Sequence, residues 1–239
     1  MSGGAAIVLQ ARMGSTRLPG KSLASIGGRS LVARAVERLR AHSGLPVVLA
    51  TTTLPADDLL CDEARQLGIE VLRGPADDVL ARYAVAVSAL GLTAVVRATA
   101  DNPAVDFDAP RRTLDMLRRS GADYVVDRGL PLGATVEAVS AAALVRAAGL
   151  ATAAYDREHV TPYIRRDSRA RALDLLAPLT LRRPELRFTV DTADDLTAMR
   201  RLYAELGPPA APAPLEQFIL AADRLHARAT AAQIGVDAR

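Results

Sequence analysis

The chain has 239 residues, half of them hydrophobic, and its 30 basic and 27 acidic side chains leave a formal net charge of +3. This length suits one large α/β domain, with or without a small appendage. The composition is that of a globular protein rather than a disordered one. The near balance of charge and an aromatic content of 3% exclude the basic field and stacking platforms of a nucleic-acid binder.

Cysteine usage and the hydropathy pattern indicate the compartment. Cys61 is the only cysteine, so an internal disulfide is excluded and a reducing cytoplasm is expected. Its helical context without an activating partner favours packing over catalysis. The first apolar run, residues 5–9, is too short for a signal peptide, and no run reaches the length of about 18 residues that crosses a membrane.

In the first half of the chain, short runs rich in Val, Ile and Leu alternate with helical periodicity. The predicted strands cover residues 5–9, 46–50, 70–72, 94–98 and 123–126. The predicted helices cover residues 30–41, 57–67, 77–90 and 107–119, and Ser30 is the expected N-cap of the first. This alternation predicts an α/β fold of three layers, with a doubly wound, mostly parallel sheet.

The second half is less regular after Asp127. Strands are predicted at residues 135–139, 173–176 and 187–190, and helices at residues 141–154, 157–165 and 192–205. Four prolines then mark a linker, and a last helix covers residues 215–229. The linker prolines are Pro208, Pro209, Pro212 and Pro214. We therefore predict one α/β domain over residues 1–206, followed by a proline-rich linker and C-terminal helix over residues 207–239.

Polar residues follow several of the predicted strands. In open parallel sheets, ligands bind at the carboxyl ends of the strands. That edge is expected to collect the loop after Leu9 together with Thr51, Thr52, Arg73, Gly74, Asp101 and Asp191.

The loop from Gly14 to Lys21 invites comparison with a P-loop, which has four residues between its first Gly and the Gly-Lys pair. This loop has five. A P-loop Lys also opens a helix whose N-terminus binds phosphate, whereas Gly27 and Gly28 follow here within two turns. The spacing therefore disfavours an ordinary P-loop ATPase.

The same loop combines three cations with two glycines. Arg12, Arg17 and Lys21, the only lysine of the chain, alternate with Gly14 and Gly20 directly after the first predicted strand. Glycines allow close approach of the backbone to a ligand, and the cations neutralise a polyphosphate. The alternatives are a triphosphate-binding loop and a solvated basic turn.

Five motifs, in order, carry a resemblance to a known family. They are Gln10-Ala-Arg-Met-Gly-Ser-Thr-Arg-Leu-Pro-Gly-Lys21, Arg73-Gly-Pro-Ala-Asp-Asp-Val-Leu-Ala-Arg82, Arg97-Ala-Thr-Ala-Asp-Asn-Pro103, Arg157-Glu-His-Val-Thr-Pro-Tyr163 and Arg187-Phe-Thr-Val-Asp-Thr192. Together they resemble the cytidylyltransferases of the spore-coat-polysaccharide type, which are relatives of the CMP-Kdo and CMP-acylneuraminate synthetases. The resemblance extends from residue 5 to about residue 202.

The resemblance implies a nucleotide-diphospho-sugar-transferase-like fold with a smaller acceptor and dimerisation insertion at about residues 128–180, and a homodimer. It implies CTP as donor, Mg²⁺ as cofactor and an acidic small-molecule acceptor. The triphosphate would be bound by Arg12, Gly14, Ser15, Arg17 and Lys21, with Arg12, Lys21 and Asp101 as catalytic residues. The nucleoside would be bound by Gln10, Ala11, Thr51, Thr52, Arg73, Asp78, Arg82, Arg97 and Thr99. Nucleic acid and membrane are not expected as partners.

Asp101 and Asp191 are the candidate metal ligands. Each follows a predicted buried strand, so both are expected at one cleft, although either could instead cap the next helix. Mg²⁺ prefers carboxylate oxygens. The resemblance implies the same pair.

Glu137, Glu158 and His159 are the candidate acceptor contacts, since they lie in the half of the chain that would recognise the acceptor. His159 is interpreted as an acceptor contact or a structural residue rather than as a proton-transfer group. A sugar-acid hydroxyl needs a base, whereas a phosphonate or phosphate oxygen is already ionised. The sequence leaves both acceptor classes open.

Two other functions are weighed against this one. A nucleotide-sugar glycosyltransferase usually carries an Asp-x-Asp motif, but Asp101 is followed by Asn102 and Pro103. A non-catalytic nucleotide-binding scaffold would be expected to lack a metal carboxylate or the loop lysine, and this chain has both.

Overall fold

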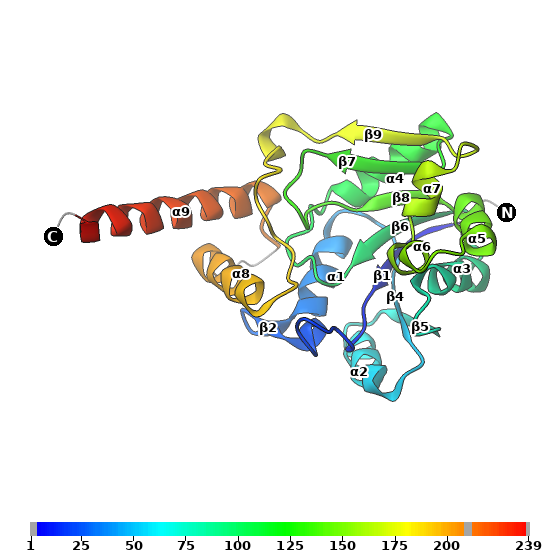
Figure 1. Cartoon of the computed structure of the whole chain (residues 1–239), viewed down its shortest axis with the longest axis horizontal. Coiled ribbons are helices and arrows are strands. Elements are labelled where there is room, and N and C mark those ends of the chain that lie inside the picture. The colour runs from blue at the N-terminus through cyan, green and yellow to red at the C-terminus, as the bar shows by residue number, and fades with distance from the viewer. Residues whose placement is uncertain (1–3, 208–211, 238–239) are drawn as a thin grey trace.

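The computed structural model describes residues 4–207 and 212–237. Within these residues seven strands form one sheet in the order β5-β4-β1-β6-β8-β7-β9 (Figure 1). The strands are β1 (Ala5–Gln10), β4 (Val47–Thr52), β5 (Glu70–Gly74), β6 (Ala94–Thr99), β7 (Tyr124–Arg128), β8 (Glu137–Ser140) and β9 (Ala172–Leu176). Strand β8 runs antiparallel to β6 and β7, and the other pairings in this sheet are parallel. The predicted mostly parallel α/β fold is confirmed.

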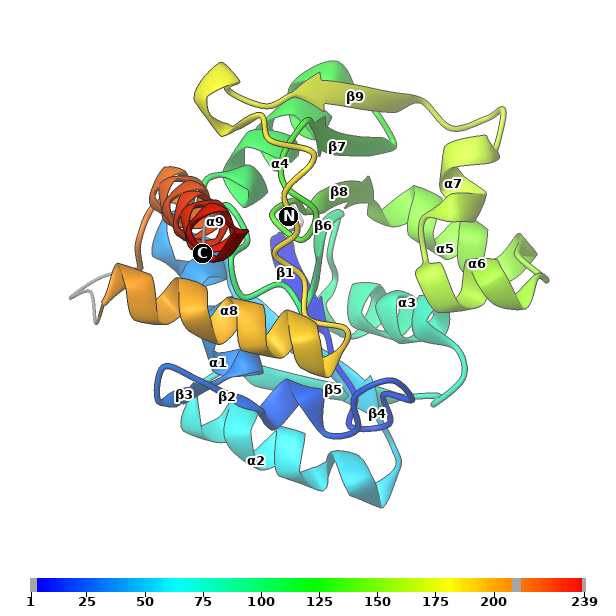
Figure 2. The same cartoon turned by 60° about the vertical axis from the view of Figure 1, so that its left-hand side comes forward.

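Helices cover both faces of the sheet, which gives three layers (Figure 2). One face packs against α1 (Leu31–Ala41), α2 (Asp58–Gln66) and α4 (Ala109–Ser120), and the other against α3 (Val79–Leu90), α5 (Ala141–Leu150) and α7 (Pro162–Arg166). Helix α6 (Ala154–His159) packs on α3 and α7. Successive side chains of β1 point to opposite faces of the sheet. Ile7 and Leu9 pack against the first group of helices, and Ala6 and Val8 pack against the second.

A third apolar cluster joins α8 (Ala193–Leu206) to the first turns of α9 (Leu215–Asp237). Arg38 of α1 fastens this cluster, since it donates to the carbonyls of Val105 and Ala213 at 2.6 Å each and lies over the ring of Phe218. Helix α9 then projects from the body (Figure 1). None of the described helices is long and apolar enough to span a membrane. Pro208 and Pro209 of the predicted linker lie outside the described residues.

The chain after Lys21 does not continue as an α-helix. Lys21–Leu23 forms one short 3-10 helix, and a hairpin of β2 (Ser25–Ile26) and β3 (Arg29–Ser30) follows. Gly27 and Gly28 both have positive φ, 56° and 80°, as a two-residue hairpin turn of this kind requires. The lysine therefore lacks the helix of a P-loop, as the spacing predicted.

The predicted strand at residues 187–190 is wrong. This segment makes a single bridge, from Leu132 to Arg187, and otherwise runs between loops. Its N–H groups are satisfied by loop carbonyls instead of a strand, because Phe188 donates to Leu132 and Val190 donates to Asp101.

The predicted helices at residues 141–154 and 157–165 are differently divided. Helix α5 ends at Leu150, and the chain re-enters a helix at Ala154. A tight turn then separates α6 from α7, in which Val160 has φ 70° and the Thr161 N–H donates to the His159 carbonyl at 2.8 Å. Such a turn is strained for a β-branched residue. Pro162 cannot continue α6, and it starts α7 instead.

Candidate active site

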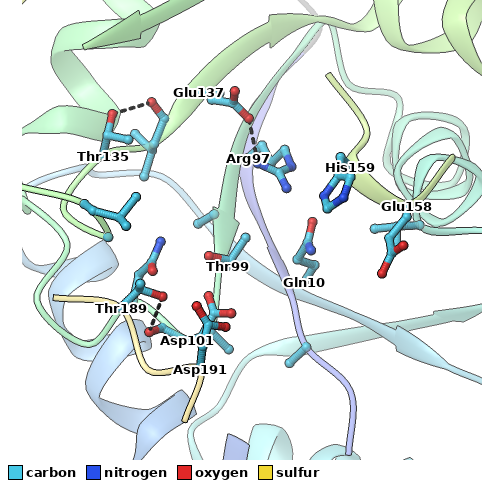
Figure 3. Close-up of a pocket in the computed structure, with 18 of the residues that line it drawn as sticks. Gln10, Arg97, Thr99, Asp101, Thr135, Glu137, Glu158, His159, Thr189 and Asp191 are labelled. Carbon is cyan, nitrogen blue, oxygen red and sulfur yellow. Dashed lines mark hydrogen bonds and ion pairs between the residues drawn. The ribbon is translucent and has the colours of Figure 1, made fainter. Parts of the chain in front are cut away.

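A cleft of about 580 Å³ opens at the carboxyl ends of β1 and β6. The chain passes from β1 outward to β4 and β5 and then returns to β6, so the order of the strands reverses at this point. Reversals of this kind create the ligand-binding crevice of open α/β sheets. Figure 3 shows Gln10, Thr99 and Asp101 lying along it. The volume is in the range of small-molecule sites.

The lining of the cleft is predominantly basic. Eight basic and four acidic residues line it among those that the structure describes. The basic residues are Arg12, Arg17, Lys21, Arg82, Arg97, Arg128, Arg165 and Arg187, and the acidic ones are Asp101, Glu137, Glu158 and Asp191. An excess of fixed positive charge in a concave site concentrates anions there. The cleft is therefore suited to a polyanionic ligand.

Asp101 and Asp191 lie side by side at the floor of the cleft (Figure 3). Backbone contacts bring them together, since the Val190 N–H donates to the Asp101 carbonyl at 2.8 Å and the Thr189 hydroxyl donates to the same oxygen at 3.4 Å. Gly133 permits this approach: a Cβ there would lie 2.6 Å from the Thr189 nitrogen, and its φ is 91°. Only glycine suits that position.

Lys21 lies between the two carboxylates. Its Nζ donates to Asp101 Oδ2 at 2.9 Å and to Asp191 Oδ1 at 3.0 Å. Arg17 and Arg187 also contact Asp191, at 3.0 and 2.8 Å. Partial burial works to raise the pKa of Asp191, but the hydrogen bond and charge of Lys21, followed by Arg17 and Arg187, outweigh it and lower that pKa below its usual value. Asp191 is therefore held as an anion.

The pair of carboxylates fits a magnesium ion that is bound together with phosphates. No group of three or more His, Cys, Asp or Glu residues that could hold a metal occurs within residues 4–207 and 212–237. Mg²⁺ keeps several waters and is commonly bound through one or two carboxylates plus substrate phosphates. Asp101 and Asp191 supply that number.

Glu137, at the start of β8, is the centre of a buried network on the other side of the cleft. It accepts hydrogen bonds from Arg97 at 2.6 Å, Tyr124 at 2.5 Å and Thr161 at 3.0 Å. Burial works to lower the pKa of Arg97, but the charges of Glu137 and then Tyr83 raise it above its usual value. Burial and then Glu137 raise the pKa of Tyr124. This network fixes the wall formed by β6, β7 and β8.

Asp57 anchors the beginning of the basic loop. Its carboxylate accepts the N–H of Met13 at 2.7 Å and also binds both the N–H and the hydroxyl of Thr52. Asp57 is 2% exposed, so these charge-assisted bonds are shielded from water. Asp57 thus ties the start of the loop to Thr52 at the end of β4.

Comparison with known proteins assigns the chain to a family. A sequence model of the cytidylyltransferase family matches residues 5–217. The spore coat polysaccharide biosynthesis protein SpsF of Bacillus subtilis is 34% identical over 207 residues, which cover 84% of this chain and 86% of SpsF. The chain belongs to the cytidylyltransferase family. It is accordingly a CTP-dependent nucleotidyltransferase, as the five motifs predicted.

Solved structures share the fold of this cytidylyltransferase. A cytidylyltransferase from Leptospira borgpetersenii superposes with a TM-score of 0.84 at 24% identity, covering 93% of this chain and 95% of that one. A CMP-2-keto-3-deoxy-manno-octonic acid synthetase in complex with CTP superposes with a TM-score of 0.65 at 16% identity, covering 85% of this chain and all of that one. At these identities the likeness concerns the fold.

Most of the residues predicted for the site meet in the cleft of this cytidylyltransferase. They are Gln10, Ala11, Arg12, Ser15, Arg17, Lys21, Arg82, Arg97, Thr99, Asp101, Glu137, Glu158, His159 and Asp191. Gly14, Thr51, Thr52, Arg73 and Asp78 do not line it. The individual roles of all these residues stay predictions.

Four of the five residues outside the cleft have their side chains in or against the supporting structure. Thr51 is buried, and Thr52 binds Asp57. Arg73 donates to the Thr52 and Leu54 carbonyls and to Asp58. Asp78 caps α3 through the Ala81 N–H and pairs with Arg157 at 2.8 Å. The structure thus gives Thr52, Arg73 and Asp78 bracing contacts.

The sequence did not single out several residues that line the cleft. They include Asn102, Tyr124, Arg128, Thr135, Arg165, Arg187 and Thr189. Asn102, Arg187 and Thr189 belong to the motifs that carried the resemblance, so their motif membership was a usable signal. Tyr124 and Arg128 lie at the two ends of β7, and their place depends on the pairing of β7 with β8. No local feature of the sequence indicated that these two residues would line the cleft.

Asp195 in the first turn of α8 holds Asp191 in place. Its Oδ2 accepts the N–H groups of Asp191 and Thr192 at 2.9 Å each, and its Oδ1 accepts from Arg187 at 2.9 Å. The Arg187 hydrogen bond is the largest cause that lowers the pKa of Asp195, against the opposing effect of burial. The folded pKa therefore lies below the unfolded value of about 3.9. Ionised Asp195 stabilises the fold above that pH, and this contribution is lost as the pH falls toward the folded pKa.

We expect Asp195→Asn to lower the free energy of unfolding by about 1 kcal/mol at neutral pH. The difference from the wild type should shrink as the pH falls below about 4, because Asp195 of the unfolded wild type then takes up a proton while the folded protein still holds it ionised, which favours unfolding. Urea unfolding of both proteins at a series of pH values measures this difference. A difference that stays constant down to the lowest pH would contradict the assignment.

Proposed function

We propose that the protein is a Mg²⁺-dependent enzyme that transfers CMP from CTP to an acidic small-molecule acceptor and releases pyrophosphate. The observation that carries the proposal is the convergence of Lys21, Asp101 and Asp191 on the floor of a basic cleft. Nucleotidyl transfer depends mainly on positioning and charge neutralisation. Lys21 provides a positive charge for the phosphates, and the two aspartates provide carboxylates for a metal ion, all at one point of the cleft.

The proposed reaction is an in-line attack of an acceptor oxygen on the α-phosphorus of CTP, with pyrophosphate as the leaving group. Arg12, Arg17 and Lys21 bind the triphosphate and neutralise the charge that develops on it. Asp101 and Asp191 hold Mg²⁺, which supplies further charge neutralisation when it is bound. Fixing the donor beside the acceptor contributes through proximity and orientation.

The nucleoside is proposed to lie toward β1 and α3. The side chain of Gln10 lines this part of the cleft, where its Oε1 accepts from the Tyr83 hydroxyl at 3.3 Å. Arg82 is held by the carbonyls of Pro75 and Ala76, while its buried Nε has no partner among the described residues. A buried donor without a partner is costly. Arg82 also lines the cleft, where its guanidinium can donate to an acceptor atom of the base.

The acceptor is proposed to lie against β7, β8 and α6. Each acidic group there is already paired: Glu137 accepts from three donors, and Glu158 lies 3.6 Å from Arg12. His159 packs against Tyr155 in a tilted arrangement, with ring centroids 4.4 Å apart. A phosphonate or phosphate acceptor reacts without a base. The family resemblance and the name of the octonic acid synthetase support instead a sugar acid of the Kdo or nonulosonate kind. Both classes belong in the test.

We also propose a homodimer that uses the region of about residues 128–180, and a cytoplasmic location. Six of the ten large apolar side chains that the described residues expose belong to this region, and exposed apolar surface of this kind is what a protein interface covers. The six are Leu132, Val145, Leu150, Tyr155, Leu176 and Leu179. The buried, unpaired Cys61 accords with a reducing compartment.

The test is an assay of pyrophosphate release. Purified protein is incubated with CTP, Mg²⁺ and a panel of sugar acids, phosphonates and phosphates, and ATP, GTP and UTP replace CTP as controls. We expect release with CTP and at least one acceptor, and mass spectrometry should identify the CMP-linked product. Binding of UDP-sugars in preference to CTP would instead support a glycosyltransferase and overturn the proposal.

A further inference from the structure

The ammonium group of Lys21 has a full set of partners before any ligand binds. Besides the carboxylates of Asp101 and Asp191, it donates to the Val190 carbonyl at 2.8 Å. An ammonium group has three donors, and all three are used. The side chain is only 13% exposed. Lys21 therefore cannot bind a phosphate from this position without giving up at least one of these bonds.

The charge of the two carboxylates is also compensated. Asp101 is paired with Lys21, and Asp191 is paired with Lys21, Arg17 and Arg187. Arg187 is shared with Asp195, so three cations and three carboxylates meet here. A divalent ion that approached this arrangement alone would meet repulsion from the cations at short range. The metal ligands that the sequence predicted are therefore already neutralised by the chain itself.

A metal ion and the Lys21 ammonium compete for the same oxygens. Mg²⁺ binds oxygen at about 2.0–2.1 Å, and Lys21 Nζ lies 2.9 and 3.0 Å from the two oxygens that face each other across it. Two cations cannot occupy that space together. Lys21 can leave that space, because its side chain is a flexible four-carbon stem. A triphosphate offers the ammonium group more anionic oxygens than the two carboxylates do.

We infer that Lys21 is a stand-in cation that occupies the metal site until CTP binds, so that nucleotide and metal bind cooperatively. The triphosphate draws Lys21 off Asp101 and Asp191, and the two carboxylates then become available to the ion. The inference rests on the proposed function, since it takes Asp101 and Asp191 as the metal ligands. It makes Lys21 a positioning residue for the metal in addition to a phosphate contact.

The test measures metal binding without nucleotide and without turnover. Mn²⁺ prefers carboxylate and water ligands, as Mg²⁺ does, and the electron paramagnetic resonance signal of free Mn²⁺ reports how much is bound. Lys21→Met removes the competing charge and keeps an unbranched side chain. We expect it to bind Mn²⁺ about tenfold or more tightly than the wild type. Lys21→Arg, which keeps the charge, should bind as weakly as the wild type.

Arg65→Met is the matched control. It also removes one positive charge, but Arg65 pairs with Asp62 on the exposed side of α2, away from the cleft. It should leave Mn²⁺ binding unchanged, which separates a local effect from a change in net charge. Because Lys21→Met leaves two carboxylates facing each other, Mn²⁺ should also raise its Tm more than that of the wild type. Because the rise in Tm is measured relative to each protein without Mn²⁺, it tests the inference even if Lys21→Met is less stable than the wild type.

The second part of the test uses the α,β-methylene analogue of CTP, in which the bridge between the α- and β-phosphorus atoms cannot be cleaved. Calorimetry gives its affinity with and without Mn²⁺ for each protein. Mn²⁺ should improve the affinity by a larger factor in the wild type than in Lys21→Met, because coupling between two ligands is reciprocal. Equal or weaker Mn²⁺ binding by folded Lys21→Met overturns the inference. Loss of Mn²⁺ binding in every variant, even with the analogue, refutes the metal site of the proposed function as well.

Discussion

Asp101→Ala is expected to lower kcat by about a hundredfold or more, as the loss of other electrostatic anchors does. Asp101 follows β6 at the reversal of the strand order, and its Oδ2 lies 2.9 Å from Lys21. Its removal takes away one of two proposed metal ligands and leaves Lys21 bound to Asp191 alone. A hundredfold change corresponds to about 2.7 kcal/mol of transition-state stabilisation. Steady-state pyrophosphate release at saturating CTP measures it.

Asp108→Ala is the control for this variant. Asp108 belongs to the same region of the chain, but it pairs with His42 at 2.8 Å, and both side chains are exposed outside the cleft. Its replacement should leave kcat within about twofold of the wild type. If Asp101→Ala kept activity comparable to that of Asp108→Ala, the metal site would have to lie elsewhere.

The sequence predicted the two aspartates together for one sound reason and one incorrect one. Asp101 does follow a buried strand at the sheet edge. Asp191 was placed by the same argument, but the strand before it does not exist. It reaches the site because Val190 donates to the Asp101 carbonyl and Asp195 accepts the Asp191 N–H. These contacts join segments about 90 residues apart, which local periodicity does not encode.

Strand order explains why some of the residues predicted for the site do not line the cleft. Thr51, Thr52 and Arg73 end their strands at the same edge as Gln10 and Thr99, so the rule for parallel sheets gathered them all. In the folded sheet, β4 and β5 lie on the side of β1 away from β6, and the cleft opens on the β6 side. The order of strands depends on long-range pairing, and a single sequence gives little indication of it.

The contacts of Lys21 show a further limit. Its place among glycines predicted a phosphate contact, which follows from local chemistry. Its partners Asp101 and Asp191 lie 80 and 170 residues further along the chain. The competition between lysine and metal therefore becomes apparent only in three dimensions.

Glu137→Ala is expected to lower the free energy of unfolding by about 3–5 kcal/mol, because it leaves a buried charge without its partner. Arg97 donates to Glu137 at 2.6 Å, the two side chains are only 17% and 14% exposed, and the Arg97 Nε already has no partner among the described residues. The hydroxyls of Tyr124 and Thr161 would lose an acceptor as well. Urea or thermal unfolding measures the loss.

A double replacement separates this structural role of Glu137 from direct contact with the acceptor. Arg97→Leu combined with Glu137→Leu removes both charges and should recover much of the stability, since apolar residues often replace a buried ion pair at little cost. If Glu137 and Arg97 only brace the wall of β6, β7 and β8, the recovered protein should regain its KM for the acceptor and for CTP, whereas a raised KM for CTP would support the nucleoside contact predicted for Arg97. A persistent rise in KM for the acceptor alone would identify Glu137 or Arg97 as an acceptor contact. A loss below about 1 kcal/mol in Glu137→Ala, the range of an exposed pair, would mean that water reaches this network.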